Sequence, residues 1–309
     1  MLDLLTLVDL PPLTQDCLKR HFRLHPVPSD EDERADLLVR IGAQSRALVT
    51  GYGGRVTDGL LASLPALEIV ACFTAGQDMV DLAAAKRGGI RVTNNSAALA
   101  PSVADLAMGL LLSVARDITG ADRYVREGRW AHARYGPGRL MSARRMGLIG
   151  LGRIGTGIAR RAQGFGIETA YHARREKADV PWRYFGDLPE MAQWADILMV
   201  CVPGTPETDG MVDRGILDRL GPDGWLVNVS RGSIVDQDAL VEALRAGRIE
   251  RAGLDVFADE PHVPKALAEL PNVVLSPHQG SNTIEALQVR SEHLLLTLME
   301  HFELSPATT

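Results

Sequence analysis

The chain has 309 residues, of which 46% are hydrophobic and 23% charged, and this balance is typical of a soluble globular protein. A chain of this length usually exceeds what one hydrophobic core supports, so we expect two domains. Its 33 basic and 39 acidic residues give a net charge of −6. An acidic chain lacks the electrostatic footprint of a nucleic-acid-binding protein, so we expect no nucleic-acid partner.

The three cysteines, Cys17, Cys72 and Cys201, are far apart and form no CxxC pair. This pattern argues against a disulfide framework and against a cysteine zinc site, and we expect no metal. The N-terminal segment has neither a basic region nor a small-residue cleavage site, so it does not resemble a signal peptide. No uncharged apolar run approaches the roughly 20 residues of a membrane helix. We therefore expect a reduced, cytoplasmic protein without a membrane partner.

The first third of the chain alternates short apolar runs with helical patterns, which predicts βαβ units and a parallel sheet. The predicted strands are Leu4–Val8, Leu37–Ile41, Ala47–Thr50, Leu67–Cys72 and Gly89–Val92. The predicted helices are Thr14–Arg20, Gly59–Leu64 and Val80–Arg87.

A long helix is predicted over Pro101–Arg116, with the proline in its first turn. It is apolar on most sides, so we expect it to be buried between domains or subunits. The charged and aromatic segment that follows, residues 122–142, suits an excursion from the core. Because Ser102–Arg116 and Tyr124–Tyr135 are hard to bury within one subunit, we predict a two-fold homodimer.

A second series of apolar runs predicts six strands with helices between them, as a doubly wound dinucleotide-binding domain requires. These strands are residues 146–150, 168–171, 196–202, 225–229, 252–256 and 273–276. A helix is predicted over 236–245, with Asp236 as its N-cap and Gly247 at its end. The last helix can place Leu287, Leu294, Leu298 and Phe302 on one apolar face.

A glycine-rich G-x-G-x-x-G pattern follows the first of these strands, at Gly150, Gly152 and Gly155. Such a triplet occurs by chance, but here an apolar strand precedes it and a helical segment follows. Gly150 allows a tight turn, Gly152 lets the backbone approach a pyrophosphate, and Gly155 lets the helix pack against its strand. The pattern therefore predicts a dinucleotide site.

The end of the second strand of this domain distinguishes between the two nicotinamide cofactors. An NAD site normally has an acidic residue there to bind the ribose hydroxyls. This chain instead reads His172-Ala173-Arg174-Arg175. Two guanidinium groups suit the 2′-phosphate of NADP, whereas the alternative is a solvated basic turn. We expect a preference for NADP(H), with NAD(H) as the alternative.

Four ordered motifs, GLGRIG, VNVSRGSIVD, AGLDVFADEP and LSPHQGS, resemble those of the D-2-hydroxyacid dehydrogenases. The likeness covers nearly the whole chain and points to the glyoxylate/hydroxypyruvate and hydroxyphenylpyruvate reductase branch. It implies an α/β fold with two doubly wound parallel-sheet domains, a Rossmann-type cofactor domain and a flavodoxin-like substrate domain, with a cleft between them. Residues 1–97 and 283–309 would form the substrate domain, and residues 98–282 the cofactor domain.

The resemblance places the family's catalytic arginine, glutamate and histidine on Arg231, Glu260 and His278. Arg231 would bind the carboxylate of a 2-keto acid and polarise its carbonyl. His278 would protonate the oxygen when hydride reaches C2, and Glu260 would orient the ring and favour its charged form. Each residue taken alone is more often structural, so the prediction rests on the matched motifs.

The resemblance also implies further contacts. The cofactor-binding residues are Gly150, Gly152, Arg153, Ile154, Gly155, Ala173, Arg174, Arg175, Val202, Pro203, Thr208, Val229, Ser230, Asp255 and Gly280, and Asp255 would position the nicotinamide carboxamide. The substrate-binding residues are Tyr52, Gly53, Ala75, Gly76, Arg231 and His278. Trp130 would either approach a neighbouring subunit's active site or, as we expect, act as a buried anchor.

The sequence departs from the family pattern at Gln279 and Asn282, and the following TIEALQ lacks an arginine often found there. These departures affect the prediction of which keto acid is the substrate, and not the prediction of the reaction type. We expect NAD(P)H-dependent reduction of a small 2-keto acid to the D-2-hydroxy acid. The alternatives are a formate- or phosphite-type dehydrogenase, against which the Arg, Glu and His argue, and a non-catalytic cofactor-sensing protein on the same fold. Long disordered flanks, which this chain lacks, would favour the latter.

Overall fold

The computed structural model describes residues 1–304 and divides them into two compact units. The first unit comprises residues 1–99 together with the chain from residue 282 onward, and the second comprises residues 100–281. The boundaries expected from the sequence, after residues 97 and 282, lie within two residues of these divisions. Both units are α/β, and every strand pairing in them is parallel.

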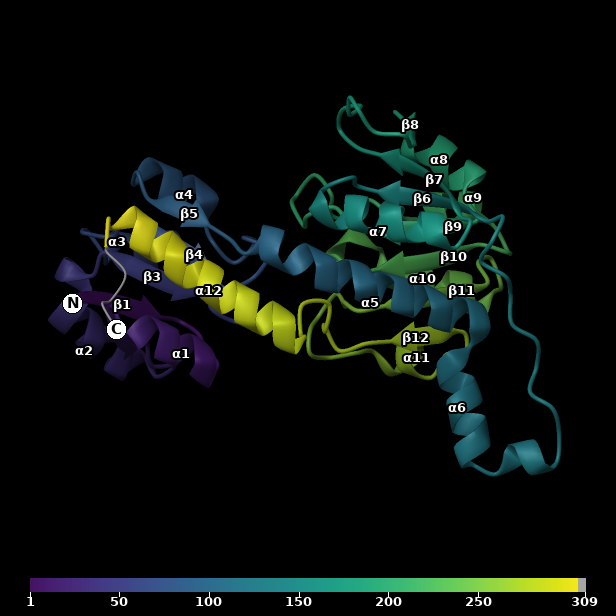
Figure 1. The fold of residues 1–309 in the computed structure, drawn as a ribbon, viewed down its shortest axis with the longest axis horizontal. Coiled ribbons are helices and arrows are strands. Elements are labelled where there is room, and N and C mark those ends of the chain that lie inside the picture. The colour runs from purple at the N-terminus through teal and green to yellow at the C-terminus, as the bar shows by residue number, and fades with distance from the viewer. Residues whose placement is uncertain (305–309) are drawn as a thin grey trace. The chain divides into compact units, whose positions relative to one another are not determined.

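The first unit contains a five-stranded sheet in the order β2-β1-β3-β4-β5, which is the flavodoxin-like order (Figure 1). Its strands are β1 Leu2–Thr6, β2 Phe22–Pro26, β3 Ala47–Thr50, β4 Ile69–Cys72 and β5 Arg91–Thr93. Its helices are α1 Pro12–Lys19, α2 Glu31–Ile41, α3 Asp58–Ala62, α4 Leu82–Arg87 and α12 Ile284–His301, with a 3-10 turn over Gly42–Gln44.

Both faces of this sheet are covered, because successive strand residues such as Leu4 and Leu5 point to opposite sides. Helices α1 and α12 cover one face and α2, α3 and α4 the other. The predicted face of the last helix is confirmed, since Leu294 and Leu298 are buried in the core and Leu287 and Phe302 pack against it.

Two predictions for the first unit were wrong. The segment Leu37–Ile41, predicted as a strand, forms the end of α2, and Asp30 caps that helix by accepting hydrogen bonds from the Asp32 and Glu33 amides. The strand β2 was missed because Phe22–Pro26 carries a basic residue, a histidine and a proline among its five residues. It is an edge strand, where proline is tolerated.

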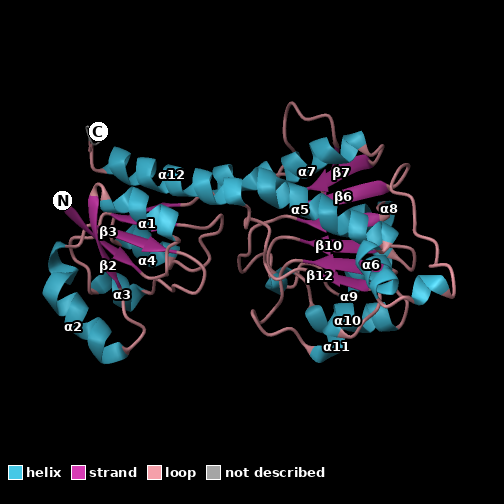
Figure 2. Ribbon diagram, turned by 60° about the horizontal axis from the view of Figure 1, so that its bottom comes forward, coloured by secondary structure: helices cyan, strands magenta, loops and turns pink. Residues whose placement is uncertain are grey.

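The second unit contains a seven-stranded sheet in the order β12-β11-β10-β9-β6-β7-β8, the doubly wound arrangement of dinucleotide-binding domains (Figure 1). Its strands are the magenta arrows that include β6, β7, β10 and β12 in Figure 2. Its strands are β6 Arg145–Ile149, β7 Glu168–His172, β8 Arg183–Phe185, β9 Ile197–Val200, β10 Trp225–Asn228, β11 Arg251–Leu254 and β12 Val273–Leu275. Six of these were predicted, whereas the three-residue edge strand β8 was missed.

Helices cover both faces of the larger sheet, with α5 and α7 on one face and α8, α9 and α10 on the other (Figure 1). The helices are α5 Ser96–Arg116, α6 Ile118–Arg126, α7 Arg153–Gly164, α8 Leu188–Trp194, α9 Arg214–Leu220, α10 Gln237–Arg245 and α11 Lys265–Ala268, with 3-10 turns over Arg129–Ala131 and Gly232–Ile234. The predicted cap of α10 is confirmed, because the Asp236 side chain accepts a hydrogen bond from the Ala239 amide.

Helix α5 starts five residues earlier than predicted, so Pro101 lies inside the helix and not in its first turn. The Asn94 side chain accepts a hydrogen bond from the Ser96 amide, which favours the earlier start. By length and composition α5 could span a membrane, yet 61% of its most hydrophobic window is buried inside the protein. A core helix of a soluble protein passes the same test, so this is weak evidence for a membrane span.

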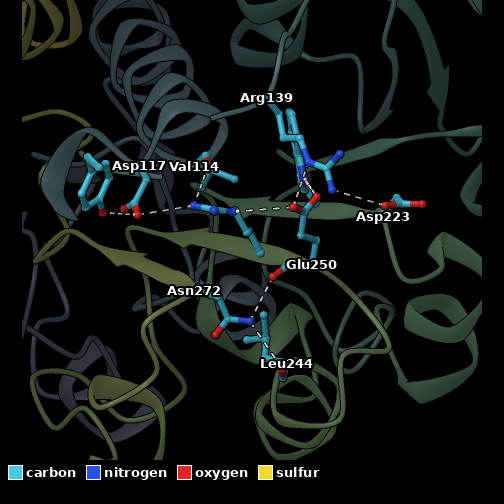
Figure 3. Close-up of polar contacts among 10 residues, drawn as sticks. Val114, Asp117, Arg139, Asp223, Leu244, Glu250 and Asn272 are labelled. Atoms are coloured by element: carbon cyan, nitrogen blue, oxygen red, sulfur yellow. Dashed lines mark hydrogen bonds and ion pairs between the residues drawn. The ribbon is translucent and has the colours of Figure 1, made fainter. Parts of the chain in front are cut away.

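The segment after α5 leaves the core, as predicted. A polar network around Glu250 holds it against the amino ends of the strands of the larger sheet, which we call the amino edge (Figure 3). The Glu250 carboxylate accepts hydrogen bonds from Arg139 Nε at 3.1 Å and from the buried Trp225 indole at 3.0 Å. Trp130 is 67% exposed within this chain, which overturns the prediction of a buried anchor. Tyr124, in contrast, is buried and packs against Tyr135.

Candidate active site

The glycine-rich turn joins β6 to α7, and its three glycines have different surroundings. A Cβ on Gly155 would lie 2.3 Å from the Gly150 carbonyl oxygen, so only glycine allows this close packing of helix and turn. Gly150 has a φ of +101°, a conformation that favours glycine. A Cβ on Gly152 would meet no atom of the described part of the chain within 4 Å. The turn therefore has the close approach at Gly155 and the open space at Gly152 that a bound pyrophosphate requires.

The first amides of α7 add the anion-binding element to this turn. The helix begins at Arg153, directly after Gly152, and no side chain caps it by a hydrogen bond. The amides of a first helical turn have no intrahelical acceptor and carry the positive end of the helix dipole. Arg153, Ile154 and Gly155 therefore stand where a phosphate group is favoured.

The predicted basic turn follows β7, which ends at His172. Ala173 accepts a hydrogen bond from the Tyr184 hydroxyl at 3.1 Å, and the side chains of Arg174 and Arg175 are exposed. The turn contains no carboxylate at the position where an NAD site usually has one.

Sequence reasoning missed one basic residue of this turn, Lys177. Its ammonium donates a hydrogen bond to the Leu151 carbonyl in the glycine-rich turn, and its amide donates to the Tyr171 hydroxyl at 2.8 Å. Lys177 thus ties the basic turn to the glycine-rich turn. The only feature of the sequence that points to Lys177 is that it is a further basic residue in the turn, three residues after Arg174.

The other residues predicted along the cofactor lie in the loops after β9 and β10. The Thr208 hydroxyl donates to the Pro203 carbonyl at 2.8 Å, and the Ser230 hydroxyl donates to the Val202 carbonyl. Val229 is buried directly before Ser230. The two loops are thus joined by a side-chain bond at the carboxyl edge of the sheet.

Glu260 and His278 come together, although 17 residues separate them in the sequence. His278 Nδ1 lies 2.6 Å from Glu260 Oε2, and the two side chains are 29% and 15% exposed, respectively. The other carboxylate oxygen, Oε1, accepts a hydrogen bond from the Phe257 amide at 2.9 Å, which holds the carboxylate in place. A carboxylate on Nδ1 orients the ring and leaves Nε2 as the nitrogen that can exchange a proton.

The loop that carries His278 is held by the buried Asp255, which is 1% exposed. Its carboxylate accepts hydrogen bonds from the Ser276 hydroxyl at 2.6 Å and from the amides of Gln279 and Gly280, both at 2.8 Å. His278 itself has a φ of +52°, which is uncommon for a residue with a side chain. Asp255 thus stabilises this loop, and its contact with the nicotinamide carboxamide stays a prediction.

Arg231 follows β10, beside the strand that leads to Glu260. Its Nη1 donates to the Ser230 carbonyl at 2.7 Å, and its own carbonyl accepts from the Asn228 side chain at 2.9 Å. At the next residue, a Cβ on Gly232 would lie 1.9 Å from the Phe257 carbonyl carbon. The loops after β10 and β11 are therefore packed backbone to backbone.

Three adjacent strands, β10, β11 and β12, are thus followed by Arg231, Glu260 and His278, respectively. All three residues lie beyond the carboxyl ends of these strands, which we call the carboxyl edge of the sheet. Parallel doubly wound sheets bind ligands outside the carboxyl ends of their strands. A guanidinium and a carboxylate–imidazole pair at this edge can bind an acid and exchange a proton with it.

In the first unit, the predicted substrate residues follow the adjacent strands β3 and β4. Tyr52 is 56% exposed, and Gly53 has a φ of +90°. The amides of Ala75 and Gly76 have no acceptor among the described residues. Two backbone donors without an acceptor can bind a carboxylate.

Within residues 1–304, no cluster of three or more His, Cys, Asp or Glu side chains could hold a metal ion. The three cysteines are free thiols. Burial raises the pKa of both Cys72 and Cys201 to about 12, so these thiols stay protonated at neutral pH.

Comparisons with known proteins agree with this arrangement. Residues 108–280 match the family model described as D-isomer specific 2-hydroxyacid dehydrogenase, NAD binding domain. The hydroxyphenylpyruvate reductase of Plectranthus scutellarioides is 42% identical over 300 residues, which are 96% of this chain and 94% of that protein. A glyoxylate/hydroxypyruvate reductase A of Arabidopsis thaliana is 43% identical over 270 residues, which are 87% of this chain and 86% of that protein.

Among solved structures, the NADPH-dependent glyoxylate/hydroxypyruvate reductase of Sinorhizobium meliloti in complex with NADP and malonate is similar with a TM-score of 0.90. It is 38% identical in sequence, and the match covers 100% of this chain and 96% of that one.

Proposed function

Because the chain belongs to the D-isomer specific 2-hydroxyacid dehydrogenase family, we propose that it reduces a small 2-keto acid, such as glyoxylate or hydroxypyruvate, to the D-2-hydroxy acid with NAD(P)H. The observation that carries this proposal is the 2.6 Å contact between His278 and Glu260, beside the Arg231 loop. Relatives named for reductions of this kind, at about 40% identity, support it.

The dinucleotide, held by the glycine-rich turn and the first amides of α7, supplies the hydride when bound. Arg231 binds the carboxylate of the keto acid through two parallel N–H groups and polarises the adjacent carbonyl. His278, protonated and oriented by Glu260, donates its Nε2 proton to the oxygen that gains negative charge. The Glu260 side chain holds Nδ1 and keeps the ring oriented while the proton leaves Nε2.

The proposed cofactor preference is for NADPH over NADH. Arg174 and Arg175 follow β7 where a 2′-phosphate would lie, and Lys177 links that turn to the glycine-rich turn. Guanidinium groups suit a phosphate dianion, whereas no carboxylate is present there to bind the free 2′-hydroxyl. The similar Sinorhizobium meliloti enzyme is described as NADPH-dependent, which supports the proposal.

A panel of 2-keto acids, assayed with NADPH and with NADH, tests both parts. We expect turnover of glyoxylate and hydroxypyruvate and a lower KM for NADPH. The double substitution Arg174→Ala and Arg175→Ala should lower kcat/KM for NADPH about ten- to a hundredfold per lost charged contact. The kcat/KM for NADH should change little. Oxidation of formate or phosphite without keto-acid reduction, or cofactor binding without any turnover, would contradict the proposed reaction. Equal use of both cofactors by the unaltered protein would contradict the proposed preference.

The proposed assembly is a two-fold homodimer, in a cytoplasmic, reducing environment that suits the three free thiols. Most of α5 is buried in the core of the second unit, so little of its apolar surface is left for an interface between subunits. The support comes from Val125, Trp130 and Leu140, which are exposed on and after α6. A dimeric mass by light scattering is expected, and a monomeric mass at micromolar concentration would overturn it.

A further inference from the structure

The carbonyl groups of the glycine-rich turn already have hydrogen-bond donors within the second unit. The Gly150 carbonyl accepts a bond from the Cys201 thiol at 3.0 Å, and the Gly152 carbonyl accepts from the Thr156 amide of α7 at 2.9 Å. The carbonyl between them, that of Leu151, accepts from a lysine ammonium. Each carbonyl oxygen of the turn is therefore held by a group of the protein.

The amide at the end of the same turn is in the opposite situation. Within residues 1–304, the Gly152 amide has no hydrogen-bond acceptor. It directly precedes the first turn of α7, which no side chain caps. Free amides beside carbonyls that are already engaged fit an anionic ligand.

The Leu151 carbonyl and the Gly152 amide belong to one peptide group. This peptide is trans and planar, so its C=O and its N–H point in opposite directions. A donor that holds the carbonyl on one side therefore turns the amide to the other side. Lys177 is that donor, so its ammonium sets the direction in which the Gly152 amide points.

Two tyrosines hold the backbone around Lys177 in place for this contact. The Lys177 amide donates to the hydroxyl of the fully buried Tyr171 at 2.8 Å. At the start of the basic turn, the Tyr184 hydroxyl donates to the Ala173 carbonyl at 3.1 Å, and the centroids of the two tyrosine rings lie 5.4 Å apart. A backbone fixed at both ends reduces the entropy that is lost when the long lysine side chain is ordered.

The carboxylates near Lys177 in the sequence do not hold its ammonium. Glu176 and Asp179 are exposed, and no ion pair among the described residues involves Lys177. Lys265, on α11 of the same unit, instead pairs with Glu269 at 3.5 Å, four residues further along. Lys177 bonds a carbonyl 26 positions away in the sequence, so its contact is with the glycine-rich turn and not with a local charge.

We propose that Lys177 is a positioning residue for the pyrophosphate of the cofactor, because it fixes the peptide between Leu151 and Gly152 so that the Gly152 amide faces the anion. In the proposed function, Arg174 and Arg175 bind the 2′-phosphate, which only NADPH carries. Lys177 acts on a group that NADPH and NADH share. The inference rests on the proposed use of a nicotinamide cofactor, and not on which keto acid is reduced.

Two fragments of the cofactor separate these roles. ADP-ribose carries the pyrophosphate without the 2′-phosphate, and 2′-AMP carries the 2′-phosphate without the pyrophosphate. In calorimetric titrations, Lys177→Met should weaken ADP-ribose binding about three- to tenfold and change 2′-AMP binding little. The double substitution Arg174→Ala and Arg175→Ala should give the opposite pattern. Lys265→Met removes an equal charge from the same unit and, as the control, should change neither affinity.

A loss confined to 2′-AMP would overturn the proposal, because Lys177 would then bind the 2′-phosphate itself. An equal loss for both fragments would also overturn it, since Lys177 would then stabilise the domain as a whole. The same holds if Lys177→Met binds ADP-ribose as tightly as Lys265→Met does. If Lys177→Met does not fold, Lys177→Gln, which also removes the charge, should show the loss for ADP-ribose alone, and any other pattern would overturn the proposal.

Steady-state kinetics give a second readout that a purely structural role would not produce. Lys177→Met should raise KM for NADPH and for NADH by the same factor and leave kcat at saturating cofactor unchanged, because the pyrophosphate takes no part in hydride transfer. A lowered kcat at saturation, or a KM raised for NADPH alone, would contradict the proposal. The titrations with ADP-ribose and 2′-AMP need no keto acid, so their result is distinguishable from a failure of the proposed reaction.

Discussion

The two edges of the seven-stranded sheet use the same residue types in opposite ways. At the amino edge, the Glu250 carboxylate is shared between Arg139 and the Trp225 indole, and the Glu250 carbonyl accepts from Asn272 (Figure 3). At the carboxyl edge, the Glu260 carboxylate holds a histidine ring on one oxygen and a backbone amide on the other. One glutamate fastens the fold, whereas the other orients a group that can gain or lose a proton.

The two edges differ in whether their polar groups are paired within the protein, and this difference indicates which edge binds a ligand. At the amino edge, permanent charges are paired with each other, and the contacts stabilise a surface segment. At the carboxyl edge, the first turn of α7 has no side-chain cap and His278 is held in a left-handed conformation. Uncapped amides and an uncommon backbone conformation fit a site arranged for a ligand.

The substitution expected to have the largest effect removes the imidazole at the carboxyl edge. His278→Ala should lower kcat for keto-acid reduction roughly 10²–10⁴-fold, because the proposed proton donor is lost. NADPH binding, measured by fluorescence titration, should remain nearly intact. The matched control is His262→Ala, since His262 is 80% exposed and lies 3.7 Å from the exposed Asp259. Unchanged kcat in His278→Ala would mean that another group donates the proton.

A second substitution tests whether the carboxyl-edge loops depend on each other. In Gly232→Ala the new Cβ would overlap the Phe257 backbone, so the loops bearing Arg231 and Glu260 must move apart. We expect a loss of about 1–3 kcal/mol of unfolding free energy, together with reduced kcat/KM. Gly164→Ala, where a Cβ meets nothing within 4 Å, is the control and should change both quantities little. If Gly232→Ala behaved like the control, the two loops would not be coupled.

Much of this edge could be predicted from the sequence, because its motifs are local. The glycine triplet, the Asp236 cap and six apolar strands each depend on neighbouring residues, and the structure contains all of them. The edge strand β8 and the strand β2 were missed because short, polar edge strands carry no continuous apolar run. Leu37–Ile41 was assigned to a strand because the acidic first turn of α2 lies outside the apolar run.

Contacts between distant residues could not be predicted from local patterns. The approach of Gly232 to Phe257, the bond from Lys177 to Leu151 and the position of Arg290 on Phe73 each join segments from different loops or elements. The exposure of Trp130 is of the same kind, since large aromatic residues are usually buried and only the fold shows otherwise.

A smaller effect is expected when Glu260 keeps its shape and loses its charge. Glu260→Gln keeps the length of the side chain but puts a neutral amide in place of the carboxylate that lies 2.6 Å from His278 Nδ1, so the ring is held by a weaker hydrogen bond. We expect kcat for keto-acid reduction to fall about tenfold, less than in His278→Ala, with NADPH binding nearly intact. The measurement is kcat with saturating NADPH for both variants. A kcat equal to that of the unaltered protein would show that Glu260 does not orient the ring.

The smallest effect on catalysis is expected at the amino edge, where Glu250→Gln makes the same chemical change. The neutral amide can still accept a bond from Trp225 or Arg139, but it cannot pair with the arginine charge. We expect a loss of about 1–2 kcal/mol of unfolding free energy by urea denaturation, since bonds to charged groups contribute more than neutral ones. The kinetic constants should match those of the unaltered protein, because the proposed catalytic residues lie at the opposite edge of the sheet. A lowered kcat in Glu250→Gln would show that the two edges are coupled, and the separation between a stabilising edge and a reactive edge would then be wrong.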